Sequence, residues 1–180
     1  MNSINAKLYI VGRIEEERIF RKYINIDNNV VVISDPELTH TASDLIPFFD
    51  MVIATGRGAM EAYSYGKPIL CPTQNSSIPL LVDENNFQKM FFYNFSPRTV
   101  IPNIDEDEEL RKIKTAILKK EGQSDFSINM FNKYFNIETV GYNYKKIYND
   151  IKFDKIEKGK NQIKVSDVYY FFSKIIKTWF

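Results

Sequence analysis

The amino-acid sequence predicts an α/β fold with a parallel sheet and helices on both faces, followed by a helical C-terminal region. Segments of helical composition separate short, nearly all-apolar runs, which are typical of strands buried on both faces of a sheet. A glycine-rich turn joins one of these runs to the helix after it, and beyond residue 105 only helical patterns and a charged linker follow. The four apolar runs are residues 7–11, 30–33, 51–54 and 69–71.

One strand and one helix open the chain. Residues 7–11 are the predicted strand, and Gly12 and Arg13 end it. Residues 15–24 are the predicted helix, because acids come first and basic residues later, in the order that the helix dipole favours. Gly12 and Arg13 should therefore lie at the carboxyl edge of the sheet.

A second strand, a loop and a short helix come next. Residues 30–33 are predicted as a buried strand. We expect residues 34–41 to form a polar loop and residues 42–48 to form a short helix that packs against the sheet. The loop contains His40, the single histidine, and a lone loop histidine is usually a solvent-exposed side chain.

The stretch after this helix has the pattern of one complete βαβ unit. A strand at residues 51–54 leads into a Thr-Gly-Arg-Gly turn at residues 55–58, and residues 59–65 have helical composition. Gly66 stands where a helix C-terminal glycine belongs, and residues 69–71 form the second strand. The turn opens at the carboxyl end of a parallel strand, where open α/β sheets bind ligands. Free N–H groups at a helix N-terminus also suit an anion.

The regularity weakens after the βαβ unit. Residues 72–77 are predicted as a loop, residues 78–82 are apolar, and residues 85–93 are aromatic and fit a strand or a helix. Five consecutive acids at residues 105–109 precede several basic residues, which predicts one helix over residues 105–121. The acids fit a solvated helix start better than an acidic binding tail.

Three further segments complete the predicted organisation. Helices are expected at residues 127–134 and 138–150, so that the main domain covers residues 1–150. Residues 151–165 are a charged linker. Residues 166–180 are predicted as an amphipathic helix, and its apolar face, from Val168 to Phe180, would prefer a partner surface such as a second copy of the chain.

Composition excludes several classes of function. A formal net charge of +1 over 180 residues argues against a nucleic-acid or anionic-membrane partner. No apolar run approaches the roughly 18 residues of a membrane helix. One cysteine, Cys71, excludes an intramolecular disulfide and fits the cytoplasm, with a peripheral place at the membrane as the alternative. One histidine, one cysteine and no clustered ligand spacing predict no metal site.

The central stretch resembles the donor-binding half of retaining GT-B-fold glycosyltransferases of the group 1, family 4-like type. The resemblance rests on Asp50, on Val-Ile-Ala-Thr-Gly-Arg-Gly-Ala-Met-Glu-Ala at residues 52–62, and on Gly-Lys-Pro at residues 66–68. Supporting pieces lie at residues 8–12, 84–87 and 94–98. The resemblance spans about residues 7–150. It implies a Rossmann-like sheet and a UDP- or GDP-sugar donor, with no tightly bound cofactor.

The resemblance also implies roles for residues of the βαβ turn. Glu61 would accept hydrogen bonds from the ribose hydroxyls of the donor, since a carboxylate suits two adjacent O–H groups. Its plain alternative is a surface glutamate early in a helix. Thr55, Gly56 and Gly58 would form the phosphate turn, where glycine lets backbone amides approach an oxyanion. Packing of strand against helix is the alternative role of these glycines.

Three more residues complete the expected site. Arg57 is the candidate catalytic residue, because it would neutralise the departing diphosphate. The alternative role of Arg57 is to pair with a structural carboxylate. Arg13, with Gly12, would reach the donor phosphates. Ser34 begins the loop where relatives hold the nucleobase.

The sequence departs from the family pattern in two respects. Many relatives carry a partner glutamate eight residues before Glu61, and this chain has Ile53 there. The acceptor-binding half, which normally comes first, is also missing, so we expect a companion domain or subunit. An inactive interaction module or a split-enzyme subunit is therefore the main alternative. A receiver-type signalling domain is a further alternative, but it would need an acidic cluster after the first strand, and this chain has none there. A nucleotide-sugar epimerase of the same GT-B architecture is a minor alternative, which would also need the missing half.

Overall fold

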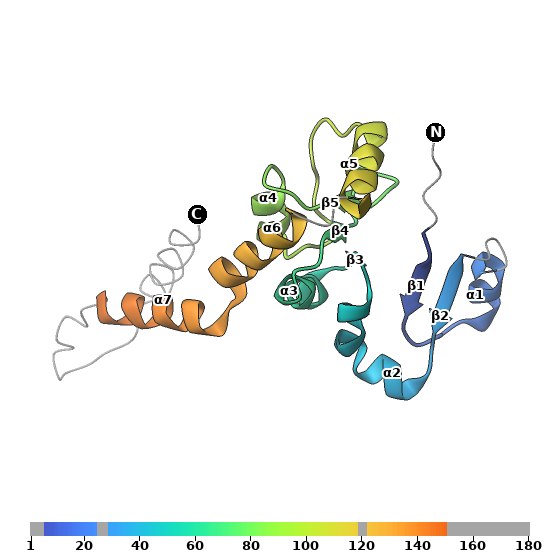
Figure 1. Ribbon diagram of the computed structural model, residues 1–180, viewed down its shortest axis with the longest axis horizontal. Coiled ribbons are helices and arrows are strands. Elements are labelled where there is room, and N and C mark those ends of the chain that lie inside the picture. Colours follow the sequence, from blue (N-terminus) through green and yellow to red (C-terminus); the bar gives the residue numbers. More distant parts are fainter. Residues whose placement is uncertain (1–5, 25–28, 119–121, 151–180) are drawn as a thin grey trace, which may run out of the picture. The chain divides into compact units, whose positions relative to one another are not determined.

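The computed structural model describes residues 6–24, 29–118 and 122–150 of the chain (Figure 1). The chain divides into two compact units, Met1–Asn132 and Lys133–Phe180. The fold is α/β, as the sequence predicted, and the described strands form two small sheets, one parallel and one mixed. The antiparallel pair in the mixed sheet departs from the parallel sheet that was predicted. The predicted linker at residues 151–165 and the amphipathic helix at residues 166–180 lie outside the described residues.

The first sheet of unit 1 pairs two parallel strands. Strands β1 (Leu8–Val11) and β2 (Val30–Ile33) are joined through helix α1 (Glu17–Ile24), and Leu8 pairs with Val30. Both strands lie where the sequence predicted them. Their burial was predicted wrongly: β2 is half-buried and most of β1 is exposed, because β1 pairs with β2 alone among the described strands.

Two short helices follow where one was predicted. Helix α2 (Pro36–His40) occupies most of the expected loop. Asp35 starts it, because its Oδ1 accepts a hydrogen bond of 2.8 Å from the Glu37 amide, and Pro36 needs no amide partner at the first helical position. The second is the 3₁₀-helix Ala42–Phe48, which contains Pro47. The predicted loop was therefore wrong, and the predicted short helix is confirmed.

The predicted βαβ unit is confirmed. Strand β3 (Val52–Ile53) runs parallel to β4 (Ile69–Cys71), and helix α3 (Gly56–Ser64) connects them. Helix α3 begins within the predicted turn, so the two glycines of that turn belong to its first turn. Strand β4 is buried, as expected. Ile53 of β3 is half exposed, because no described strand pairs with the outer edge of β3.

Gly66 ends helix α3 by satisfying its last carbonyl groups. It has a φ of +66°, and its amide donates to Tyr63 O at 3.0 Å. The Lys67 amide donates to Ala62 O at 3.0 Å, which completes a Schellman motif. The left-handed backbone at this position explains why a glycine stands there.

The second sheet is completed by an antiparallel strand and covered by a helix. Strand β5 (Leu80–Leu81) pairs with β4, so the order is β3-β4-β5. Helix α5 (Glu106–Leu118) contacts β5 (Figure 1). Its Ala116 packs with Leu70 and Leu81. The helix predicted over residues 105–121 is confirmed as far as the structure describes it.

An aromatic cluster forms the second part of the core. The ambiguous segment at residues 85–93 is helix α4 (Phe87–Phe92), and helix α6 (Gln123–Met130) contacts α3. Rings from these elements pack with centroids 5.7–6.4 Å apart. The aromatic cluster consists of Tyr63, Phe87, Phe91, Phe95 and Phe126. Burial raises the pKa of the Tyr63 phenol well above its usual range.

Cys71 is fully buried in β4 beside this cluster. Its thiol donates to Phe95 O at 3.2 Å, and burial raises its pKa to about 11. Because the thiolate is the nucleophilic form, Cys71 has a structural rather than a reactive environment.

The second unit is helical where it is described. A π-helical segment (Phe131–Phe135) begins at the end of unit 1, and helix α7 (Ile137–Asp150) follows. Asn136 Oδ1 accepts a 2.9 Å hydrogen bond from the Glu138 amide at the start of α7. Among the described helices, none combines the length and apolar character needed to span a bilayer.

Candidate functional site

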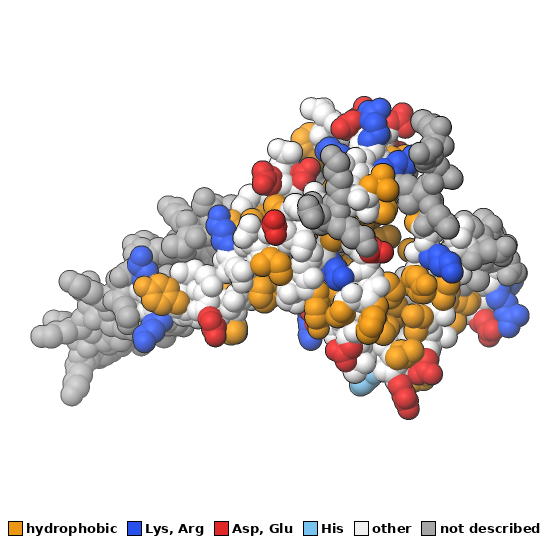
Figure 2. Space-filling view, viewed as in Figure 1, with side chains coloured by type: hydrophobic (Ala, Val, Ile, Leu, Met, Phe, Trp, Pro, Cys, Tyr) orange, Lys and Arg blue, Asp and Glu red, His pale blue; other side chains and the backbone are white. Residues whose placement is uncertain are grey.

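A hollow of about 690 Å³ runs along β3 to its carboxyl end, and we call it the β1–β3 hollow. It is lined by residues of β1, of the 3₁₀-helix and of the segment from β3 into α3. On the face seen in Figure 2, apolar side chains gather in the region of β1 and the 3₁₀-helix. Large exposed apolar residues of these segments are Leu8, Tyr9, Ile10 and Phe48.

Glu61 lies on the wall of this hollow and is held by Arg57. Arg57 Nε donates to Glu61 Oε1 at 2.7 Å, across one turn of α3. The Glu61 side chain is 30% exposed and that of Arg57 is 88% exposed. Arg57 therefore pairs with a carboxylate, but this is the carboxylate of Glu61, the other candidate site residue on the same helix. Such an exposed pair contributes at most about 1 kcal/mol to stability, so its loss to a ligand would cost little.

The glycine corner at the start of α3 is partly occupied by the chain itself. The Gly56 amide donates to Asn94 O at 3.1 Å, and the Gly58 amide donates to Thr55 O at 3.1 Å. Gly56 has a φ of +51°, and a Cβ on it would approach Asn94 Nδ2 to 3.5 Å. Two amides that the sequence assigned to a phosphate are thus already bonded. Thr55 and Gly58 line the hollow, and the Thr55 side chain makes no capping bond.

The other predicted site residues lie at the ends of the first two strands. The Gly12 amide donates to Ile33 O at 3.1 Å, which places Gly12 beside the start of the loop that contains Ser34. The side chains of Arg13 and Ser34 are exposed. The hollow brings Thr55, Gly58 and Glu61 together, whereas Gly12, Arg13 and Ser34 do not line it. His40 is exposed at the end of α2.

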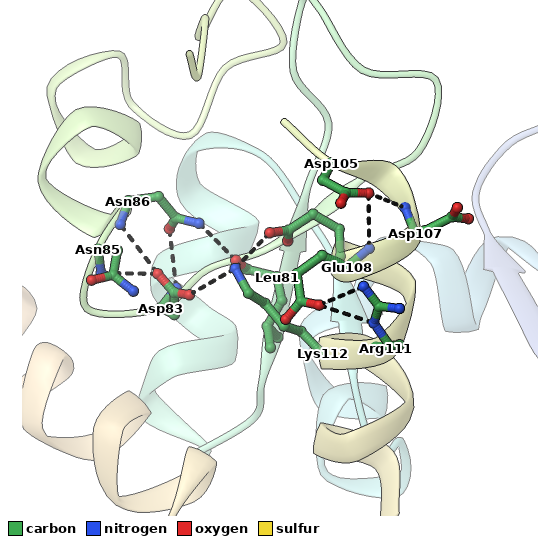
Figure 3. Close-up of polar contacts among 10 residues, drawn as sticks. Leu81, Asp83, Asn85, Asn86, Asp105, Asp107, Glu108, Arg111 and Lys112 are labelled. Atoms are coloured by element: carbon green, nitrogen blue, oxygen red, sulfur yellow. Dashed lines mark hydrogen bonds and ion pairs between the residues drawn. The ribbon is translucent and has the colours of Figure 1, made fainter. Parts of the chain in front are cut away.

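A second polar site was missed by sequence reasoning (Figure 3). Lys112 Nζ lies 2.6 Å from Glu109 Oε1 and 3.7 Å from Asp83 Oδ2. The hydrogen bond that Lys112 donates to Glu109 is the largest cause of the raised pKa of Lys112. The three-residue spacing of Glu109 and Lys112 was a readable helical signal, but the acids were interpreted only as a solvated helix start. In the described chain, no group of three or more His, Cys, Asp or Glu residues suits a metal ion.

Glu106 joins the first turn of α5 to the loop before β5. Its carboxylate accepts from the Ser77 amide at 2.6 Å, from Ser77 Oγ at 2.7 Å and from Ser76 Oγ at 3.0 Å. These bonds, led by the Ser77 amide, hold the pKa of Glu106 below its usual value. Because all its partners belong to one loop, Glu106 serves to anchor that loop.

Comparisons with models of protein families, with curated proteins and with solved structures find no match to this chain.

Proposed function

We propose that this chain is the donor-binding domain of a retaining glycosyltransferase, which holds a nucleotide sugar and stabilises the departing nucleoside diphosphate. The observation that carries the proposal is the Glu61 carboxylate on the wall of the β1–β3 hollow, one turn beyond the Thr55–Gly58 corner. Hollows of this size accommodate ligands of nucleotide dimensions.

The contacts of Glu61 support a role in binding hydroxyl groups. Oε1 accepts from Arg57, and no partner for Oε2 is found among the described residues. A carboxylate with one oxygen still open suits a ribose O–H donor. Arg57, which is mostly exposed, would exchange its bond to Glu61 for a diphosphate oxygen. Since Gly56 and Gly58 already donate to carbonyl groups, Arg57 carries more of the proposed phosphate binding than the glycine amides.

We further propose that β1 lies beside β3 in one Rossmann-like sheet of order β2-β1-β3-β4-β5. Tyr9 of β1 and Phe49 before β3 already pack with ring centroids 5.3 Å apart, and residues of both strands line the same hollow. In this order the topological switch point falls between β1 and β3, where α/β sheets bind ligands. In the proposed sheet, Gly12 and Arg13 lie at the same edge as Thr55.

Hydrogen exchange tests the proposed pairing of β1 with β3. The Leu8 and Val52 amides already donate to Asn29 O and Pro68 O, so the alternating amides of Tyr9 and Ile53 face the opposite edges. We expect Tyr9 and Ile53 to exchange as slowly as Leu8 and Val52, measured residue by residue by NMR. Free-amide exchange at Tyr9 and Ile53 beside protected neighbours would contradict a joined sheet.

Isothermal titration against UDP, GDP and ADP tests the binding site. Binding rather than turnover is the quantity to measure, because the proposed role of this domain is to hold the donor. We expect Glu61→Ala to weaken nucleotide binding by about tenfold or more, since it removes a charge-assisted hydrogen bond worth about 1.5–3 kcal/mol. Glu37→Ala, on the exposed surface of α2, is the matched control and should bind as the unaltered protein does.

Two outcomes would count against this assignment. Absence of binding at millimolar nucleotide would remove the donor-binding proposal as a whole. Binding by the unaltered protein with equal affinity in Glu61→Ala would instead leave nucleotide binding intact and exclude Glu61 from it.

A further inference from the structure

Two consecutive residues after helix α4 have a left-handed backbone, although neither is a glycine. Asn94 has a φ of +54° and Phe95 has a φ of +51°. Asparagine tolerates this conformation, whereas a bulky residue such as phenylalanine is a genuine outlier in it. We call these two residues the left-handed turn.

The end of helix α4 accounts for Asn94 but not for Phe95. The Asn94 amide donates to Phe91 O at 2.9 Å and the Phe95 amide donates to Met90 O at 2.7 Å, which is the pattern of a Schellman motif. That motif requires one left-handed residue, and Asn94 supplies it. The unfavourable backbone of Phe95 must therefore be stabilised by contacts beyond α4. Residues kept in such a conformation often lie at functional sites.

The core of unit 1 holds Phe95 in place. Its ring is fully buried in the aromatic cluster, with its centroid 5.9 Å from that of Tyr63 and 6.0 Å from that of Phe87. Its carbonyl oxygen accepts from the Cys71 thiol of β4 at 3.2 Å. Because Phe95 is fixed by the cluster and by β4, the backbone of its neighbour Asn94 is fixed with it.

Asn94 connects the left-handed turn to the glycine corner at the start of α3. Its carbonyl oxygen accepts from the Gly56 amide at 3.1 Å. Gly56 is itself left-handed and is the first residue of α3, between Thr55 and Arg57. This hydrogen bond therefore joins the buried core to the part of α3 that presents Thr55 and Arg57.

We propose that Asn94 is a positioning residue of the donor site, whose carbonyl oxygen holds the first turn of α3 in the orientation that receives the diphosphate. Groups that are fixed before a ligand arrives lose less conformational freedom on binding. The groups held in this way are Thr55 and Arg57. Asn94 does not line the β1–β3 hollow, so it acts through these residues. The inference rests on the proposed donor-binding function and deepens it.

The test compares the affinities of the full chain for UDP and for uridine, both measured by titration. Asn94→Val disfavours the left-handed backbone, because a β-branched residue is poorly tolerated there. We expect it to weaken UDP binding by at least about fivefold, since misplaced groups lose much of their contribution, and to leave uridine binding unchanged. Asn94→Gly keeps this backbone accessible and should restore the UDP affinity.

Asn103→Val is the matched control. Asn103 is an exposed asparagine with a φ of +55° that does not line the β1–β3 hollow. The same substitution there should lower stability comparably, yet leave the ratio of UDP to uridine affinity unchanged. An unchanged ratio in Asn94→Val would overturn the positioning role while nucleotide binding stands. Absence of UDP binding by the unaltered protein would instead overturn the donor-binding proposal, and this inference with it.

A measurement on the unaltered chain decides if Asn94→Val fails to fold. NMR detects the hydrogen bond between Gly56 and Asn94 as a scalar coupling from the amide nitrogen to the carbonyl carbon. We expect this coupling to persist when UDP is bound, because the bond holds the corner in the complex as well. Its disappearance on addition of UDP would overturn the proposal, since the Gly56 amide would then be released to the phosphates.

Discussion

Replacing Phe87 by alanine is expected to lower the free energy of unfolding by about 3–5 kcal/mol, a large share of the stability of a domain of this size. Phe87 is 2% exposed and lies at the centre of the aromatic cluster, where its ring packs against Tyr63, Phe95 and Phe126. These neighbours come from different elements, so none can move into the space without disturbing the others. Chemical denaturation of the purified protein measures the change.

Phe92→Ala on the same helix is the control for this effect. Phe92 is 61% exposed, so the identical substitution should change stability by no more than about 0.5 kcal/mol. Comparable losses in the two variants would show that helix α4, rather than burial of Phe87, determines the result. A loss under about 1 kcal/mol for Phe87→Ala would contradict the central place of this ring in the core.

Gly66→Ala is expected to destabilise the protein by about 3 kcal/mol. The left-handed backbone costs a non-glycine residue about 1–2 kcal/mol, and overpacking adds at least about 1 kcal/mol. A Cβ at this position would lie 2.8 Å from Ser124 Oγ and 3.2 Å from Ile128 Cγ1. The Ser124 hydroxyl can rotate away, whereas the branched Ile128 must shift within α6. Thermal and denaturant unfolding give the measurement.

Gly122→Ala separates the two contributions. Gly122 has a φ of +89°, but a Cβ there would meet no atom of the described residues within 4 Å. This variant should therefore show only the backbone cost of about 1–2 kcal/mol. If Gly66→Ala costs no more than Gly122→Ala, the contact between the end of α3 and helix α6 tolerates an added methyl group.

The βαβ unit could be predicted from the sequence because its signals are local. Two apolar runs, a glycine-rich turn and a terminal glycine all fall within residues 49–71, and each describes its own neighbourhood. The parallel pairing of Val52 with Ile69 and the left-handed Gly66 agree with them. The start of helix α2 had an equally local signal, because Asp35 can cap a helix and Pro36 suits its first position. The polar composition of residues 34–41 nevertheless led to the prediction of a loop.

Burial was predicted poorly because it depends on distant parts of the chain. The apolar runs at β1 and β3 identify strands, yet they do not state which element covers them. In the structure β4 is buried between β3 and β5, whereas β1 has a neighbour on one side in the described chain. The segment of α4 was ambiguous for the same reason, since its aromatic residues fit either structure until helices α3 and α6 pack against them.

The candidate site shows the same division between local and distant contacts. Thr55, Gly58 and Glu61 share one hollow because they lie within two turns of one helix start. The four-residue spacing of Arg57 and Glu61 likewise makes their ion pair readable. The Asn94 carbonyl on the Gly56 amide joins segments nearly forty positions apart, and no local pattern indicates such a bond.

The short spacing between paired strands also affects how quickly the chain can fold. Strand β4 pairs with β3 after a single helix, and β2 pairs with β1 after a single helix. Little loop-closure entropy opposes contacts between such near neighbours, so each pair can form early and independently. During synthesis, β1 and β2 leave the ribosome before the strands of the second sheet do.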